Sequence, residues 1–300
     1  MTRTGVILNP WSRRNRGAEA HREALPGVLT AAPRTREGLD EALAAFAAAR
    51  LDLLAIDGGD GTIRDVLTRA VEHFGDRMPP IAVLPSGKTN ALALDLGARL
   101  DWTLDQALDA FRAGRITFRA PLEVTRLGAA DPFVRGFIFG AGVYVLATDL
   151  AQRAHHMGAF NSFAVAVTLA AAAGRTLLDG PGSAWRRGTP MRVADAEPRP
   201  VFLFAASSLK RLPLGIRPFG PPSAELRTLL IEAPPRRLIR ALPPLLRGSE
   251  AAWLEQYGYR RRVVERFDLA LDGRFVLDGE AFPGGELRVT RGPELAFVKP

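Results

Sequence analysis

The sequence predicts an N-terminal α/β domain with a parallel, doubly wound sheet, followed by a β-rich domain built as an antiparallel sandwich. Short apolar runs alternate with helical patterns in the first third of the chain, which is typical of a parallel sheet. From residue 116 onward, short alternating segments separated by Pro- and Gly-rich turns replace that pattern. With 300 residues, 47% of them hydrophobic, the chain is long and apolar enough to form about two domains, each with its own hydrophobic core. We place the domain boundary near residue 118, with residues 119–300 in the second domain and the last segment free to return to the first.

Four strands and four helices account for the first domain. Strands are expected at residues 5–8, 28–32, 51–56 and 81–84, and helices at residues 17–25, 37–50, 62–73 and 104–112. Ligands of open parallel sheets bind beyond the carboxyl ends of the strands. The segments that follow three of these strands, at residues 9–10, 57–62 and 85–90, are therefore expected along one rim.

The second domain is expected to be mostly strands. The alternating segments are residues 116–126, 133–139, 201–205, 226–232, 263–271, 274–277 and 286–290. Two helical stretches, at residues 160–178 and 238–247, interrupt them, and residues 180–200 read as a hairpin or loop.

The charge balance of +8 favours anionic partners, and the absence of cysteine excludes disulfides, thiol nucleophiles and Cys-based zinc sites. Polar residues 11–16 interrupt any leader-like apolar run, and the apolar segment 162–174 is too short to cross a bilayer. We expect a cytoplasmic protein with peripheral contact at the inner face of the membrane. Clusters at residues 236–240 and 260–262 are equally compatible with anionic lipid headgroups or with solvated faces. The sequence contains no known nucleic-acid-binding motif.

The sharpest motif, Asp-Gly-Gly-Asp-Gly-Thr at residues 57–62, lies between an apolar strand and a helix. Adjacent glycines let a backbone approach a phosphate closely, and the helix start offers free N–H groups. Asp60 would repel phosphate unless Mg²⁺ or a hydroxyl lay between them. The structural alternative is a turn with an aspartate helix cap.

Four separated patches together resemble the diacylglycerol kinase catalytic-domain family, the bacterial lipid kinases of the superfamily that includes NAD kinases. They are Asn-Pro-Trp-Ser at residues 9–12, the glycine motif at 58–62, Leu-Pro-Ser-Gly-Lys-Thr-Asn at 84–90 and Asp-Gly-Glu at 278–280. The resemblance implies an α/β nucleotide-binding domain and a β-sandwich lipid domain. It also implies an enzyme that uses ATP and Mg²⁺ to phosphorylate a diacylglycerol-like or other long-chain lipid alcohol.

Site residues follow from this resemblance position by position. The nucleotide-binding set is Asn9, Pro10, Ser12, Thr35, Gly58, Gly59, Gly61, Thr62, Gly87, Lys88, Thr89 and Asn90. Thr35 rests on a loose match to the end of the second strand. Asp60 is assigned to catalysis and to metal binding, and Asp65, where the family often has Glu, is a second metal candidate.

Residues 87–90 depart from the family's usual Gly-Thr-Gly-Asn. Lys88 could neutralise phosphate charge, or it could be a solvated turn residue. The Gly-Lys-Thr here is not a Walker A loop, because Ala82 stands where that motif needs its first glycine.

Asp278 and Glu280 flank a turn-like glycine. In the kinase interpretation one of them takes the proton of the lipid hydroxyl, and the sequence leaves open which. An Asp-Gly step also begins many hairpins, and residues 272–273 carry the same pair. The proposed chemistry requires residues 278–280 to act together with the glycine motif at one site.

Other features of the sequence distinguish less clearly between the possible functions. The Pro-rich turn at residues 221–226 lacks the Asp-Gly pair of a structural Mg²⁺ site, and the four histidines match no metal spacing. Two alternatives stay open. One is an NAD kinase, and the other is a non-catalytic nucleotide- or lipid-binding relative. The acyl chain, the pathway and the oligomeric state are not readable from the sequence.

Overall fold

The computed structural model describes residues 2–12, 15, 27–156, 174, 183–194 and 196–300. The expected helices at residues 17–25 and 160–178 lie outside the described residues, apart from residue 174. The chain divides into two compact units, which are described separately. The first comprises residues 1–121, 134–136 and 293–300, and the second comprises residues 122–133 and 137–292.

The first unit contains a sheet with the strand order β2-β1-β3-β4-β15-β5. Its strands are β1 (Thr4–Leu8), β2 (Val28–Ala31), β3 (Leu53–Gly58), β4 (Ile81–Pro85), β5 (Ile116–Arg119) and β15 (Leu295–Val298). Strands β1 to β4 run parallel, and β15 is parallel to β4 but antiparallel to β5. The last strand of the chain therefore completes the sheet that the first strand begins.

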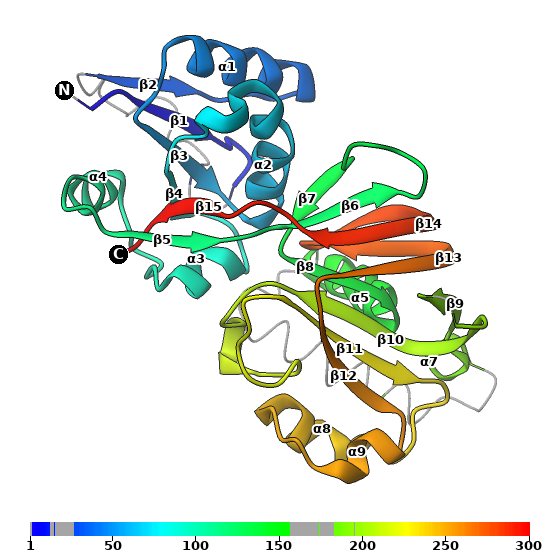
Figure 1. Cartoon of the computed structure of the whole chain (residues 1–300). Coiled ribbons are helices and arrows are strands. Elements are labelled where there is room, and N and C mark those ends of the chain that lie inside the picture. Colours follow the sequence, from blue (N-terminus) through cyan, green and yellow to red (C-terminus); the bar gives the residue numbers. More distant parts are fainter. Residues whose placement is uncertain (1, 13–14, 16–26, 157–173, 175–182, 195) are drawn as a thin grey trace. The chain divides into compact units, whose positions relative to one another are not determined.

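Helices cover both faces of this sheet (Figure 1). They are α1 (Arg36–Ala48), α2 (Asp60–Phe74), α3 (Ala91–Leu96) and α4 (Leu104–Arg112). Ala107, Leu108 and Ala110 of α4 share a buried cluster with alternate residues of β1, β3 and β4. On the opposite face α1 comes so close to β1 that a Cβ on Gly5 would lie 2.7 Å from the ring of Phe46. Glycine at that position is what lets the helix approach the strand.

The second unit is built on an antiparallel sheet in the order β12-β11-β10-β8-β13-β14-β6, with β9 beside β10 and β13. Its strands are β6 (Leu122–Arg126), β8 (Ile138–Gly142), β9 (Thr189–Val193), β10 (Arg199–Ser207), β11 (Leu226–Glu232), β12 (Tyr259–Val264), β13 (Arg266–Leu277) and β14 (Glu280–Arg291). Phe139 stacks on Phe275 with ring centroids 5.0 Å apart, inside a cluster of further aromatic rings. The expected fold class, parallel α/β followed by antiparallel β, is confirmed.

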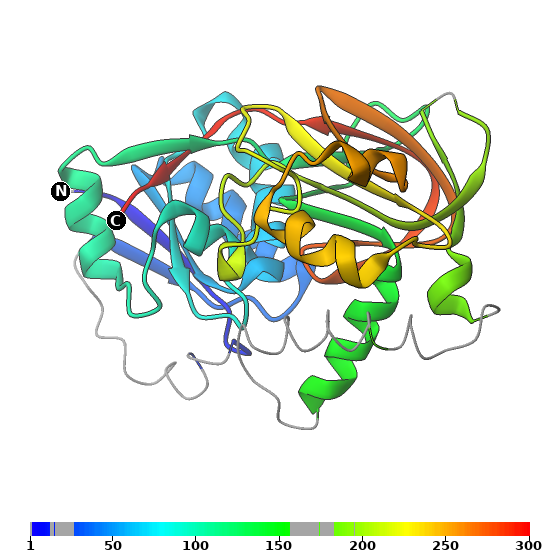
Figure 2. The same ribbon diagram turned by 90° about the horizontal axis from the view of Figure 1, so that it is seen from below.

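Helices α5 (Val143–His156), α7 (Ala184–Arg187), α8 (Leu238–Arg247) and α9 (Ala252–Gln256) belong to the second unit. Figures 1 and 2 show α8 and α9 side by side. Leu238, Ala241 and Leu245 of α8 are buried in a core shared with β10, β11 and Leu254 of α9. The remaining short strand, β7 (Val134–Gly136), packs on α2 in the first unit, where the backbone N–H of Arg135 donates to Thr68 Oγ1 at 2.9 Å. No helix among the described residues is both long and apolar enough to span a bilayer.

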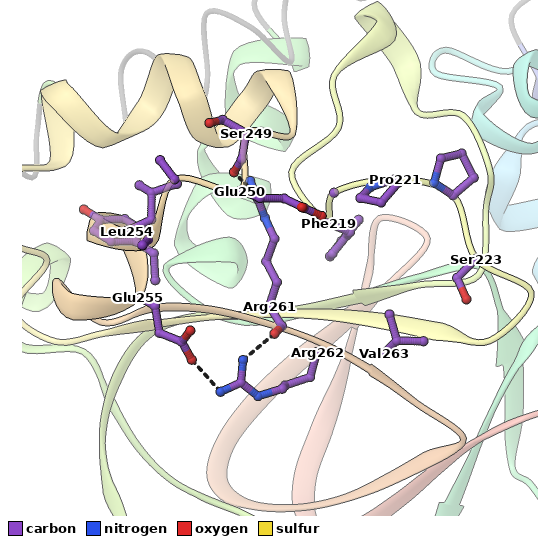
Figure 3. Close-up of a pocket in the computed structure, with 15 residues that line it drawn as sticks. Phe219, Pro221, Ser223, Ser249, Glu250, Leu254, Glu255, Arg261, Arg262 and Val263 are labelled. Atoms are coloured by element: carbon purple, nitrogen blue, oxygen red, sulfur yellow. Dashed lines mark hydrogen bonds and ion pairs between the residues drawn. The ribbon is translucent and has the colours of Figure 1, made fainter.

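A cavity of about 380 Å³ lies in the second unit, between the loop before β11, helix α9 and strand β12 (Figure 3). Phe219, Pro221 and Leu254 line it together with Arg261 and Arg262. None of its lining residues belongs to the site expected from the sequence. Both guanidinium groups are already engaged, since Arg261 donates to three backbone carbonyls and Arg262 pairs with Glu255. The cavity therefore lies apart from the residues of the expected nucleotide site.

Candidate nucleotide-binding site

Three loops meet at the carboxyl ends of β1, β3 and β4. Strand register places Leu8 beside Asp57, and Gly58 beside Pro85. The backbone continues this pairing beyond the strands, because the Asn9 N–H donates to Asp57 O at 2.9 Å and the Ser86 N–H donates to Gly58 O at 3.2 Å. Residues 9–12, 57–62 and 85–90 are thus neighbours on one rim, as the order of strands and helices predicted.

Asp57 is the buried centre of this rim, with 2% of its surface exposed. Its Oδ1 accepts a hydrogen bond of 2.9 Å from Asn15 Nδ2 and another from Ser86 Oγ. The two donors come from the loops after β1 and β4, so one carboxylate ties three loops together. A buried carboxylate needs such partners because burial without them is costly. Sequence reasoning did not assign Asp57, Asn15 or Ser86 to the site, although Asp57 lies at the end of β3, Ser86 directly follows β4 and Asn15 lies in the loop after β1.

The Gly58 position explains how Asn9 reaches the glycine motif. Asn9 Nδ2 donates to Thr62 Oγ1 at 2.7 Å, and Asn9 Oδ1 accepts the Trp11 N–H at 2.9 Å. A Cβ on Gly58 would lie 2.6 Å from Thr62 Oγ1. Glycine therefore leaves the space into which the Thr62 side chain packs, and the hydroxyl then holds the loop after β1.

Gly59 and Gly87 bring two loops into direct backbone contact. A Cβ on Gly87 would lie 2.3 Å from Gly59 Cα, and one on Gly59 would lie 2.9 Å from Gly87 Cα. The loop that contains Gly87 is closed by Asn90, whose Oδ1 accepts the Gly87 N–H at 2.9 Å while its Nδ2 donates to Gly87 O at 3.1 Å. Asn90 itself adopts a left-handed backbone, with φ of 52°, which asparagine tolerates better than most residues.

Asp60 is the first residue of α2, and its carboxylate faces the start of α3. The Leu92 N–H donates to Asp60 Oδ1 at 3.4 Å. Burial raises the pKa of the Asp60 carboxyl, while backbone N–H groups of residues 90–92 act in the opposite direction. A carboxylate in a loop beyond the end of a strand is expected to face solvent, whereas the structure places that of Asp60 against another helix. The aspartate cap weighed as the structural alternative is not formed on α2, whose N-cap is Gly59 without a side-chain hydrogen bond; the Asp60 carboxylate instead accepts a backbone N–H of α3.

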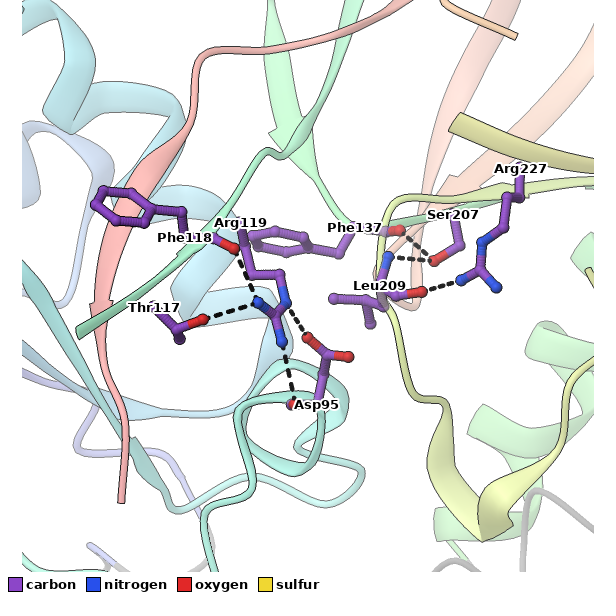
Figure 4. A network of polar contacts seen from close by, with 8 residues as sticks. All are labelled: Asp95, Thr117, Phe118, Arg119, Phe137, Ser207, Leu209 and Arg227. Atoms are coloured by element: carbon purple, nitrogen blue, oxygen red, sulfur yellow. Dashed lines mark hydrogen bonds and ion pairs between the residues drawn. The ribbon is translucent and has the colours of Figure 1, made fainter. Parts of the chain in front are cut away.

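Helix α3 is held in turn by a buried ion pair (Figure 4). Arg119 Nε lies 2.5 Å from Asp95 Oδ2, and the same guanidinium donates to Thr117 Oγ1 and to the carbonyl of Phe118. The Asp95 carboxylate is fully buried. Removing one partner of such a pair leaves an uncompensated buried charge, so α3 is firmly fixed to β5. The backbone N–H groups that face Asp60 are therefore fixed in place.

Asp65 lies one turn further along α2, where it pairs with Arg64 at 2.8 Å. The Arg64 side chain is 2% exposed, whereas that of Asp65 is 43% exposed. Within the described residues, no group of three or more His, Cys, Asp or Glu side chains is placed to hold a metal ion. Mg²⁺ at phosphoryl-transfer sites is usually bound by one or two carboxylates plus substrate phosphates, so a single loop carboxylate still suits it. Asp60 fits that donor set better than Asp65, which Arg64 already engages.

The other predicted nucleotide contacts differ in their surroundings. Ser12 is 8% exposed, and its Oγ has no hydrogen-bond partner among the described residues. Pro10 is buried, Thr89 is half-buried and Lys88 is exposed, while Gly61 lies in the first turn of α2. Thr35 is the N-cap of α1, where its Oγ1 accepts the Gly38 N–H at 3.1 Å. Its hydroxyl is thus used within α1, which gives the loose sequence match no separate support.

Asp278 and Gly279 form a two-residue hairpin turn in the second unit. Leu277 of β13 pairs with Glu280 of β14, and both turn residues have positive φ, 47° and 81°. This is the backbone of a tight Asp-Gly hairpin. The Asp278 carboxylate accepts the backbone N–H groups of Phe137 at 3.0 Å and Ile138 at 2.9 Å. It therefore fixes the start of β8 to the hairpin, whereas Glu280 is exposed.

The second Asp-Gly pair behaves differently from the sequence expectation. An Asp-Gly step predicts a hairpin at residues 272–273, yet these residues lie inside β13, where the pairing with β14 shifts register between Leu271 and Arg274. Such a shift marks a β-bulge, in which extra residues leave the ladder and bend the strand. Asp272 is exposed there. Of the two Asp-Gly pairs, only the one at residues 278–279 turns the chain.

The fold and the loop geometry define a class. A parallel α/β unit with a glycine-rich loop between a strand and a helix, and a carboxylate at the start of that helix, has the form of a phosphate-binding domain. Residues 3–119 match the family model of the diacylglycerol kinase catalytic domain. The resemblance to this family is thereby confirmed, and the match contains three of the four sequence patches; the patch at residues 278–280 lies outside it.

Solved structures extend the similarity to the whole fold. A diacylglycerol kinase from Bacillus anthracis str. Sterne is similar with a TM-score of 0.65 and 12% identity. A further solved structure from that organism, provisionally described as a diacylglycerol kinase, has a TM-score of 0.69 and 12% identity. Each alignment covers 99% of this chain and 97% of the other chain. At this identity the similarity shows the fold alone. Among curated proteins, none matches the sequence.

Proposed function

We propose that the protein is an ATP-dependent lipid kinase that transfers the γ-phosphoryl group of ATP to the hydroxyl of a diacylglycerol-like or other long-chain lipid alcohol. The observation that carries the proposal is the rim of the first unit, where Asp57 ties three loops together and Gly59 contacts Gly87. Phosphoryl transfer depends on positioning and electrostatics, and a loop network fixed in this way supplies positioning.

The nucleotide is assigned to that rim. Backbone N–H groups at the start of α2 favour negative charge, because a helix N-terminus carries a partial positive charge. The buried Ser12 hydroxyl has no hydrogen-bond partner within the described residues, which supports the proposal that it would donate to a phosphate oxygen. Lys88, exposed on the loop after β4, adds a cation that a triphosphate would attract. Asn9 and Asn90 hold the two flanking loops in shape.

Asp60 would hold Mg²⁺ together with the phosphates of the nucleotide. Bound there, the ion neutralises charge that develops on the transferred group. The positioning of this carboxylate depends on other residues of the chain. The N–H groups at the start of α3 orient the Asp60 carboxylate, and the Asp95–Arg119 pair keeps α3 in place.

Glu280 is the general base of the proposed reaction. A base needs a lone pair that can reach the lipid hydroxyl, and Asp278 directs its carboxylate to the N–H groups of Phe137 and Ile138. Glu280 is exposed at the end of the same hairpin. It accepts the hydroxyl proton as the lipid oxygen bonds to the γ-phosphorus and the bond to ADP breaks. Asp278 is a positioning residue that holds the hairpin on which Glu280 lies.

Purified protein incubated with labelled ATP, Mg²⁺ and either dispersed diacylglycerol or NAD tests this proposal. Label is expected in the lipid and absent from NAD. Phosphorylated NAD with inert lipid would instead identify an NAD kinase. Tight ATP binding without transfer to any lipid of a panel of long-chain alcohols would identify a non-catalytic relative. Inspecting a lipid extract of cells that overproduce the protein for a new phosphorylated lipid would then identify the acceptor.

A further inference from the structure

Helix α8 presents an outward face that combines positive charge with an exposed aliphatic side chain. The segment 236–247 contains four arginines and no carboxylate. Arg240, Pro243 and Arg247 are exposed on the side of the helix opposite the buried Leu238, Ala241 and Leu245. Ile239, on the same outer side, is 65% exposed. We call this outer side, with Arg236 and Arg237 at its start, the α8 face.

The arginines of the α8 face differ from the neighbouring basic cluster on β12. There, Arg260 pairs with Glu232 at 2.9 Å and Arg262 pairs with Glu255 at 2.6 Å. Among the described residues, no arginine of the α8 face forms an ion pair with a carboxylate. The two clusters were indistinguishable in the sequence. The structure pairs two arginines of the β12 cluster with carboxylates and leaves the α8 face as a concentrated positive charge.

Aromatic rings hold two of these arginines in place. The guanidinium carbon of Arg237 lies 4.5 Å from the centroid of the Tyr257 ring, and that of Arg240 lies 5.5 Å from the centroid of the Trp253 ring. Both contacts are within cation–π range and leave the charge available to an outside anion. Below them, the Tyr259 hydroxyl donates to the carbonyl of Arg236 at 2.8 Å, and burial raises the pKa of Tyr259 to about 12. The donor therefore stays protonated at physiological pH.

We propose that the α8 face docks the protein onto an anionic lipid bilayer, with the arginines at the phosphate level and Ile239 entering the interface. The inference rests on the proposed function, because a kinase whose acceptor is a lipid must meet a bilayer. Charge complementarity selects the anionic leaflet. The exposed isoleucine, with Trp and Tyr rings alongside, favours a bilayer over a purely polyanionic partner, since these are the residue types of membrane interfaces.

Vesicle co-sedimentation tests the proposal without nucleotide or catalysis. The full-length protein is mixed with phosphatidylglycerol-containing vesicles or with neutral phosphatidylcholine vesicles. Arg236→Gln/Arg240→Gln removes two unpaired charges, and Arg260→Gln/Arg262→Gln is the matched control with the same change in net charge. A cation near an anionic surface contributes about fivefold to binding, so the first pair is expected to weaken binding about 25-fold and the control less than about threefold. Ile239→Gln should weaken it about tenfold at unchanged charge.

Equal losses in the two double variants would overturn the proposal, because net charge alone would then explain binding. The proposal would also be overturned if the Ile239→Gln variant bound anionic vesicles as strongly as the wild type, or if the wild-type protein did not bind them. Transfer to diacylglycerol dispersed in detergent micelles separates this inference from the proposed function. The α8 variants should keep the wild-type rate there. If the protein bound vesicles through the α8 face but had no lipid kinase activity, the proposed function would be refuted and the docking proposal would stand.

Discussion

The glycine loop of the first unit and the hairpin at residues 278–280 of the second unit both carry Asp-Gly motifs, but they use their carboxylates differently. At the rim of the parallel sheet, Asp57 and Asp60 are directed inward onto neighbouring loops and onto helix α3. At the hairpin, Asp278 is directed onto backbone N–H groups of its own sheet, while the next carboxylate, Glu280, is exposed. The first region is a preorganised set of loops, residues 9–12, 57–62 and 85–90, which we call the cradle. The second is a hairpin that holds one exposed carboxylate, that of Glu280.

This difference assigns the two steps of the proposed reaction to different regions. A network in which Asp57, Asn9 and Asn90 are held by hydrogen bonds suits binding and charge neutralisation, which need little movement. An exposed carboxylate on a fixed hairpin suits proton transfer to a bulky acceptor. Variants in the cradle should therefore affect nucleotide handling, and variants in the hairpin should separate chemistry from folding.

The largest effect is expected from Asp60→Asn, which should remove nearly all transfer. Because burial raises the pKa of Asp60 in the folded protein, the ionised form lowers stability at neutral pH, and that penalty disappears on acidification. The neutral amide should thus leave the thermal midpoint unchanged or slightly higher. For the same reason, the wild-type rate should begin to fall on acidification above the usual titration range of an aspartate. Transfer at a near wild-type rate by the variant would reduce Asp60 to a helix cap.

Gly87→Ala should disrupt the cradle by overpacking. The new Cβ would lie 2.3 Å from the Cα of Gly59, and backbone cannot move aside as cheaply as a side chain. We expect a loss of about 1–3 kcal/mol in stability, together with weaker ATP binding. Gly61→Ala is the control for folding, since its Cβ would meet nothing closer than 3.9 Å. Equal melting temperatures for the two variants would contradict the close contact.

Asp278→Asn should cost about 1–3 kcal/mol of stability, because a charge-assisted acceptor for two backbone N–H groups is weakened. The same substitution at the exposed Asp272, in the bulge of β13, should cost much less. Urea denaturation of the two variants gives the comparison directly. If Asp272→Asn proved the more damaging, the positioning role of Asp278 would be wrong.

Lys88→Met should have the smallest effect, raising the KM for ATP about tenfold with little change in kcat, since one exposed cation near a phosphate contributes modestly. Lys210→Met, at an exposed position of the second unit, removes the same charge and should leave both constants unchanged. A common shift in the two variants would point to net charge rather than to the loop.

The sequence was most informative where structure is local. The apolar runs of β1, β3 and β4 and the loops that follow them could be predicted, because strand and turn signals lie next to each other in the chain. The segment 116–126 was predicted as one strand but forms two, β5 and β6, which pair in different sheets. Pro121 lies between them, and proline, which lacks an N–H, cannot donate to a ladder.

Contacts between residues far apart in the chain could not be predicted from these local signals. Nothing near Asn15 in the chain indicates that its amide donates to Asp57, or that Gly87 packs on the backbone of Gly59. Strand β15 was not predicted at all, since four residues carry little periodicity. The groups that donate to the Asp278 carboxylate, the N–H groups of Phe137 and Ile138, likewise lie some 140 positions away in the chain.

Glu280→Gln offers the most direct test of the division between cradle and hairpin. ATP affinity by titration calorimetry and phosphoryl transfer to dispersed diacylglycerol would be measured on one preparation of the variant. We expect ATP affinity equal to that of the wild type and turnover lower by about 10²–10⁴, the range for removal of a general base. Turnover close to that of the wild type, or ATP binding lost in parallel with turnover, would contradict the account.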